Sequence, residues 1–84
     1  MLHKYRKTAL IEAEQFDGSD EMISRYGIVD LAKAIESKEE TTYVIPTKEG
    51  SMELKKGDYI STGIDGEHWP VKKSIFERTY ERCD

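Results

Sequence analysis

The sequence predicts an α+β fold: an antiparallel meander sheet of about five strands, curled or barrel-like, with one or two helices packed on one face. Two observations lead to this prediction. From Thr41 onward, short alternating segments are separated by Gly-containing breaks, as in a meander. Earlier in the chain, apolar residues recur at helical spacing. The length of 84 residues leaves room for a single domain, residues 1–84.

The first predicted strand is Thr8–Phe16. Its side chains alternate between two faces, with Ile11, Ala13 and Gln15 on one and Leu10, Glu12, Glu14 and Phe16 on the other. Because the second set contains two glutamates, we expect the Ile11 face to meet the core. The sequence Asp17-Gly18-Ser19 is a strong signal for the end of this strand.

Two helices are predicted next. Ser19 or Asp20 can cap a short first helix, which Gly27 interrupts. A second helix, from about Val29 to Ser37, has the clearest amphipathic pattern in the chain. Its apolar stripe comprises Ile28, Leu31, Ala32 and Ile35.

The meander follows, in the segments TTYVIPT, SMELKK, YISTGI and HWPVK. Pro46 and Pro70 cannot donate to a ladder, so we expect them at strand ends or on an edge. Ser74 is predicted to cap a short turn over residues 75–77. Residues 79–83 either continue that helix or form a final strand, and we favour the strand. The sheet residues expected to pack under the helical stripe are Ile11, Tyr43, Ile45, Met52, Leu54, Ile60, Trp69 and Val71.

Composition narrows the function classes. Hydrophobic residues make up 37% and charged residues 36%, near the polar edge of globular proteins, so we expect a homo-oligomer to add stability. The single cysteine, Cys83, excludes an internal disulfide and a cysteine-based zinc site, and we expect no cofactor or metal. With no signal-peptide pattern and no apolar run of ~20 residues, we expect a cytoplasmic protein without a membrane partner.

The net charge of −4 is unevenly distributed, because residues 9–40 carry nine acidic and three basic side chains. Binding to a phosphate backbone depends on Lys and Arg, so this distribution disfavours nucleic acid as a partner.

Five ordered pieces resemble a family of small bacteriophage and prophage proteins: QFDG at 15–18, EG at 49–50, GDYI at 57–60, GIDGE at 63–67 and WPVKKSIFERTYE at 69–81. The family is named for a Pro-Gly-Asp-Tyr-Gly motif. This chain departs from the motif, with Lys56 in place of the Pro and Ile60 in place of the last Gly. The resemblance implies a phage accessory protein of unassigned function, acting in the host cytoplasm, and transfers no catalytic residues.

Three groups of residues are candidates for a ligand site. Asp58 and Tyr59 follow Gly57 in a turn that could hold an anion or a base, although Gly57 and Asp58 also suit a purely structural turn. His68 stands near Asp65 and Glu67, and Trp69 could stack on a planar ligand; a hairpin end with a core tryptophan is the simpler interpretation.

The third group is basic: Lys72 and Lys73 with Arg78 and Arg82, which share a face if residues 78–82 are helical. Glu77 and Glu81 accompany them, so a solvated charged face is the simpler interpretation. Cys83 has no neighbour that would activate a thiol, and we expect it to be incidental.

These observations favour a non-enzymatic protein-interaction module that acts on a host protein. A small-molecule or nucleotide-binding protein, with a phosphorylated ligand at Tyr59, Trp69 and Lys72, is the alternative. A small hydrolase using His68 with Asp65 or Asp58 is a second alternative. We expect no enclosed, reactive cleft.

Overall fold

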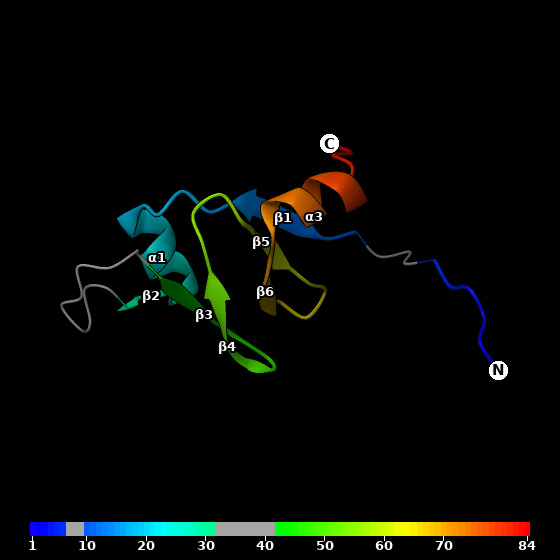
Figure 1. Cartoon of the computed structure of the whole chain (residues 1–84), viewed down its shortest axis with the longest axis horizontal. Helices are drawn as coiled ribbons and strands as arrows, with labels where there is room; N and C mark the ends of the chain where they lie inside the picture. The colour runs from blue at the N-terminus through cyan, green and yellow to red at the C-terminus, as the bar shows by residue number, and fades with distance from the viewer. Residues whose placement is uncertain (7–9, 32–41) are drawn as a thin grey trace.

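The computed structural model describes residues 1–6, 10–31 and 42–84. In these residues the chain forms two three-stranded antiparallel sheets and two helices (Figure 1). The first sheet has the order β1-β5-β6, with β1 at Glu12–Gln15, β5 at Tyr59–Thr62 and β6 at His68–Val71. The second has the order β2-β3-β4, with β2 at Val29–Asp30, β3 at Tyr43–Thr47 and β4 at Gly50–Leu54. The helices are α1 at Asp20–Tyr26 and α3 at Lys73–Thr79.

The predicted α+β class is confirmed, but the prediction of one five-stranded meander or barrel is wrong. The chain changes sheets at the turn after β4. Gly57 sits there with φ of 96°, a conformation that glycine adopts readily, and its N–H donates to the carbonyl of Phe16 at 2.8 Å. The N–H of Phe16 donates in return to the carbonyl of Asp58 at 2.8 Å. These two bonds direct β5 onto β1 instead of β4.

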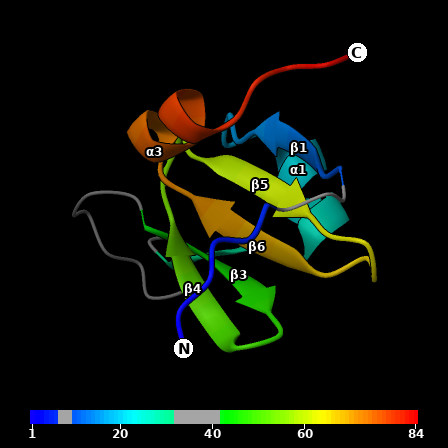
Figure 2. The ribbon, with the colours of Figure 1, turned by 90° about the vertical axis from the view of Figure 1, so that its right-hand side faces the viewer.

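The prediction that the helices share one face of the sheet is also wrong. From α1, the ring of Tyr26 meets His68 edge to face, with centroids 4.9 Å apart. From α3, the ring of Phe76 stacks on Tyr59, with centroids 4.1 Å apart. Since Tyr59 pairs with Val71, and Thr62 pairs with His68, Tyr59 and His68 point to opposite faces. The two helices therefore lie on opposite sides of the β1-β5-β6 sheet (Figure 2).

The core lies between the two sheets and α1. Phe16 and Tyr43 meet in it edge to face, with centroids 4.9 Å apart. Its buried apolar side chains are Phe16, Met22, Ile28, Tyr43, Ile45, Leu54 and Ile60.

The expected Ile11 core face is a wrong prediction, because the opposite face carries the buried Phe16 and Ile11 is only half-buried. The second sheet covers the face that bears Phe16. Of the other expected core residues, Met52 is 41% exposed on the edge strand β4, and Trp69 and Val71 are half-buried.

The start of α1 confirms the predicted cap. Ser19 accepts a hydrogen bond from the N–H of Met22 at 3.3 Å, and Asp20 and Glu21 occupy the first turn. At the other end Gly27, with φ of 66°, donates to the carbonyl of Ser24. This left-handed cap turns the chain out of the helix.

The predicted second helix is wrong at its start. The N–H of Ile28 donates to the carbonyl of Ile23, which completes the cap and sends Ile28 into the core. Val29 then pairs with Val44 as part of β2, and Leu31 is half-buried. The remainder of that prediction, with Ala32 and Ile35, lies outside the described residues.

Residues 72–84 also differ from the prediction. Instead of a turn followed by a strand, α3 runs to Thr79, and residues 80–84 have no regular structure. Ser74 lies inside the first turn of this helix and does not cap it, because the residue before the helix is Lys72. The cap comes from Asp58, whose carboxylate accepts a hydrogen bond from the N–H of Lys73.

Candidate functional site

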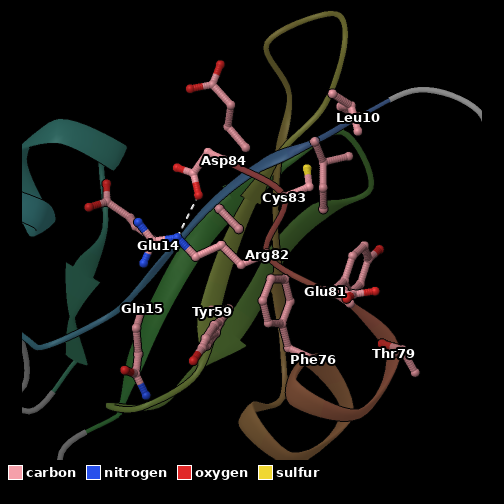
Figure 3. A pocket seen from close by; sticks show the side chains of 14 residues that line it. Leu10, Glu14, Gln15, Tyr59, Phe76, Thr79, Glu81, Arg82, Cys83 and Asp84 are labelled. Carbon is pink, nitrogen blue, oxygen red and sulfur yellow. Dashed lines mark hydrogen bonds and ion pairs between the residues drawn. The ribbon is translucent and has the colours of Figure 1, made fainter.

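An open groove of about 1000 Å³ lies between β1 and the C-terminal part of the chain. One side is formed by β1 and the two residues before it, the other by α3 and residues 80–84 (Figure 3). The groove residues are Leu10, Ile11, Glu12, Ala13, Glu14, Gln15, Tyr59, Phe76, Thr79, Tyr80, Glu81, Arg82, Cys83 and Asp84.

The groove follows the free edge of β1. It touches six successive residues, 10–15, whose side chains alternate between the two faces of the strand, as expected for a groove that runs beside the strand's edge. Six residues of a strand span about 17 Å. β1 pairs with β5 on one side only in the described part of the chain.

The backbone groups on that edge can be assigned from the pairing. Phe16 donates its N–H inward, to Asp58 on the β5 side. Backbone groups alternate in direction along an antiparallel strand, so those of Glu14 and Glu12 also point inward. Those of Ala13 and Gln15 point away from β5, and no backbone partner for them occurs within residues 1–6, 10–31 and 42–84. The edge thus offers unpaired donors and acceptors to an extended chain.

Three stacked rings form the aromatic part of the groove. Phe76 lies between Tyr59 and Tyr80, with centroid distances of 4.1 and 4.7 Å and interplanar angles of 12° and 17°. The Tyr59 hydroxyl donates to the Glu77 carboxylate at 3.0 Å, and this hydrogen bond is the main cause that raises the pKa of Tyr59. The rings hold α3 against β5 and offer an aromatic surface beside the edge.

A charged cluster lies on the opposite face of β1. The carboxylate of Glu14 accepts hydrogen bonds from Arg25, at 2.8 Å, and from the Tyr26 hydroxyl, and Arg25 also pairs with Glu21 at 2.6 Å. Burial, followed by the hydrogen bond to Glu14, raises the pKa of Tyr26 to about 12. The hydrogen bond to Glu14 likewise raises the pKa of Arg25. The cluster joins β1 to α1.

Asp58 and Tyr59, both predicted as ligand residues, have structural partners. One oxygen of Asp58 accepts from the N–H of Lys55 at 3.1 Å, and the other from the N–H of Lys73 at 3.3 Å. Asp58 thus closes its own turn and supplies the missing cap of α3. Tyr59 stacks on Phe76 by one ring face and still borders the groove. Of the predicted ligand residues, Tyr59 lines it, as does Arg82 from the basic group.

His68 and Trp69 lie at the far end of the β5-β6 pair from Asp58. The Nδ1 atom of His68 is 2.9 Å from the Thr62 hydroxyl, and the ring contacts Tyr26. Asp65, its proposed acidic partner, is 3.4 Å from Lys48 instead. Within the described residues, His68 forms no ion pair or hydrogen bond with a carboxylate, and no three His, Cys, Asp or Glu side chains are grouped to hold a metal ion.

Trp69 lies on the other face, beside Gly63. A Cβ atom at Gly63 would stand 3.0 Å from the Trp69 ring and would overlap the Glu67 carboxylate. This close approach explains the glycine at that position.

The predicted basic strip does not form as one helical face. Lys72 and Arg78 are exposed at the start and in the last turn of α3. Arg82 lies beyond the end of the helix and pairs with Asp84 at 2.6 Å. Residues 78–82 are not all helical, so the condition under which Arg78 and Arg82 would share a helix face is not met.

Sequence reasoning missed most of the groove. Phe76 and Tyr80 are four residues apart, and only the alternative of a helix that continues through residue 79 places them on one face. The edge position of β1 had no local signal, because it depends on which strand β5 pairs with.

Comparisons with known proteins do not assign the chain to a family. No family model matches the chain, and neither the search of curated proteins nor that of solved structures found a match. The resemblance to phage proteins stays a prediction. No helix in the described part of the chain is long and apolar enough to cross a membrane. Fold and site define an α+β chain of two small antiparallel sheets with an open strand edge.

Proposed function

We propose that this chain is a non-enzymatic protein-interaction module that holds an extended peptide segment along the free edge of β1. The observation that carries the proposal is the groove, which follows six successive residues of an edge strand whose outward backbone groups have no partner in the described residues. A peptide added as a further strand gains main-chain hydrogen bonds, and pockets beside the edge select its side chains.

The stacked rings of Tyr59, Phe76 and Tyr80 (the ring stack) and the acidic side chains of the groove provide that selection. Apolar side chains of the segment lie against Phe76 and Tyr80, and basic ones lie near Glu12 and Glu81. The volume of about 1000 Å³ is at the upper end for small-molecule sites, and its extent along a strand suits a chain better than a compact ligand. Together with the resemblance to phage proteins, this supports a host protein as partner, in the cytoplasm of the host cell.

To test this, peptides are selected from a random display library on the immobilised full chain. The Kd of each selected peptide is then measured for the native protein, for Ala13→Pro and for Ala13→Val. Ala13→Pro removes the outward N–H of the edge while leaving the β1-β5 hydrogen bonds in place. Ala13→Val keeps the N–H and is the matched control. We expect at least about tenfold weaker binding to Ala13→Pro, equal to about 1.4 kcal/mol, and near-native binding to Ala13→Val.

Equal binding to a folded Ala13→Pro variant would overturn the proposal, as would a selection that enriches no peptide. Because Ala13→Pro can perturb folding, amide hydrogen exchange on the native chain provides a second readout. The amides of Ala13 and Gln15 should exchange more slowly when a selected peptide is bound. Unchanged exchange at these two amides would contradict the β1 edge as the binding site.

A further inference from the structure

We infer that the extended segment held at this edge is residues 1–6 of a second copy of the chain, so that two copies exchange their N-terminal segments. This inference rests on the proposed function of the β1 edge. Three features of residues 1–6 and the groove support it: exposure, charge and side-chain alternation.

Residues 1–6 are all exposed and include large apolar side chains. Leu2 is 100% exposed and Tyr5 90%, and the segment runs away from both sheets (Figure 1). The β1 edge is open in the same structure. One chain therefore presents both an apolar extended segment and an unfilled strand edge, and a pair of copies related by a two-fold axis can fill both edges at once.

The charges of segment and groove are complementary. The segment carries Lys4 and Arg6 and no acidic residue. The groove is lined by four acidic residues and one basic residue, a balance of −3. Glu14 and Asp84 already pair with Arg25 and Arg82, whereas Glu12 and Glu81 have no ion pair in the described part of the chain. Glu12 thus offers an unpaired carboxylate on β1 to a basic side chain of the segment, and the balance of −3 favours the second basic side chain as well.

The alternation of side chains along the segment and along β1 then determines how the two strands align. In an extended segment Lys4 and Arg6 point to one side, and Tyr5 to the other. On β1, Glu12 and Glu14 point to the α1 face, and Ala13 to the face that bears the ring stack. The register that places Lys4 and Arg6 beside the glutamates also places Tyr5 against Phe76 and Tyr80. A slip of one residue reverses both pairings, so alternation determines which side chains of the segment face each side of β1.

The native cysteine serves as the attachment point for a cross-linking experiment. Cys83 is the only cysteine of the chain, it is exposed, and it lines the groove. A photoreactive maleimide attached there in a mixture of ¹⁵N-labelled and unlabelled protein should cross-link to residues 1–6 of the other isotopic form. Sedimentation equilibrium of unmodified protein over a wide concentration range should show a monomer–dimer equilibrium.

Charge reversal tests the assigned contacts. Lys4→Glu with Arg6→Glu should weaken dimerisation about tenfold or more, and Glu12→Lys should weaken it in the same direction. Mixing these two variants should restore a mixed dimer, since each segment then meets a complementary groove. Lys48→Glu, on the β3-β4 turn away from the groove, is the control and should leave dimerisation unchanged.

A chain that stays monomeric at every concentration would overturn the inference. Cross-links confined to one isotopic form would do so as well, because they mean that the segment folds back on its own β1, and so would dimer cross-links outside residues 1–6. None of these results affects the peptide-binding test, in which selected peptides still distinguish Ala13→Pro from Ala13→Val.

Discussion

The carboxylate of Asp58 accepts a hydrogen bond at 3.3 Å from the backbone N–H of Lys73, fifteen residues further along the chain. Through it, the turn before β5 caps the first turn of α3, which has no side-chain cap of its own. The same carboxylate closes the Lys55–Asp58 turn. One side chain therefore fixes both the sheet change and the helix that forms one side of the groove.

Replacing Asp58 should destabilise this arrangement. We expect Asp58→Ala to lower the free energy of unfolding by about 0.5–2 kcal/mol, the range for a lost N-cap, and Asp58→Asn to lower it less. Urea denaturation followed by circular dichroism measures this. Asp65→Ala, which removes only an exposed ion pair with Lys48, is the control and should cost less than ~1 kcal/mol. An equal effect of the two alanine variants would contradict the capping role.

Leu54 and Met52 differ sharply in burial although both lie on β4. Leu54 is 0% exposed and Met52 41%. We expect Leu54→Ala to lower the unfolding free energy by about 2–5 kcal/mol, through lost burial and the cavity left behind, and Met52→Ala by less than about 1 kcal/mol. The comparison is made by thermal and urea unfolding. A large loss for Met52→Ala would mean that this side chain is covered in solution, for instance by a second copy.

Gly63 stands where a side chain does not fit. Gly63→Ala should displace the Glu67 carboxylate, which accepts from the N–H of Asp65 at 3.0 Å, and should press on the ring of Trp69. Because Trp69 is the only tryptophan, its fluorescence should shift and the midpoint of thermal unfolding should fall. Adding Glu67→Ala should relieve part of the clash. If the double variant is no more stable than Gly63→Ala, the clash with Glu67 is not the cause.

Ser61 has a fully buried hydroxyl without a hydrogen-bond partner among the described residues. Burying an unpaired hydroxyl costs free energy, so Ser61→Ala should leave stability unchanged or raise it by up to about 1 kcal/mol. The exposed Ser51→Ala on β4 serves as the control for the loss of a hydroxyl in a strand. A clear loss of stability in Ser61→Ala alone would show that the hydroxyl has a partner in solution.

Tyr26 should make the fold sensitive to alkaline pH. Its pKa is raised from 10.0 to about 12, by burial first and by the hydrogen bond to Glu14 second. A raised pKa means that the folded state favours the protonated hydroxyl. The stabilisation is therefore complete below pH 10 and is lost as the pH rises towards 12.

Tyr26→Phe should have a weaker dependence of unfolding free energy on pH across this window, measured by urea denaturation at successive pH values. Tyr59, whose pKa is also raised, contributes in the same direction, so the difference between native protein and variant isolates Tyr26. Identical alkaline profiles for the two proteins would rule out this role.

Local sequence signals predicted the elements that depend on local chemistry. Ser19 and Gly27 bound α1 as expected, because a cap is made by residues within one turn of the helix end. The β3-β4 and β5-β6 pairs follow from short connections between alternating segments, since such segments fold back as hairpins. The α+β class was predicted from two patterns, the alternation of side chains in the strand segments and the helical spacing of apolar residues earlier in the chain.

Long-range pairing decided the rest. Whether β5 pairs with β4 or with β1 depends on backbone bonds between Gly57 and Phe16, which are far apart in the sequence, and this choice makes β1 an edge. It also determines that Phe16, and not Ile11, enters the core. The length of α3 depends likewise on a cap and a ring stack supplied by Asp58 and Tyr59. Sequence alone determined the local elements, whereas only tertiary structure placed the groove, because its two sides come from opposite ends of the chain.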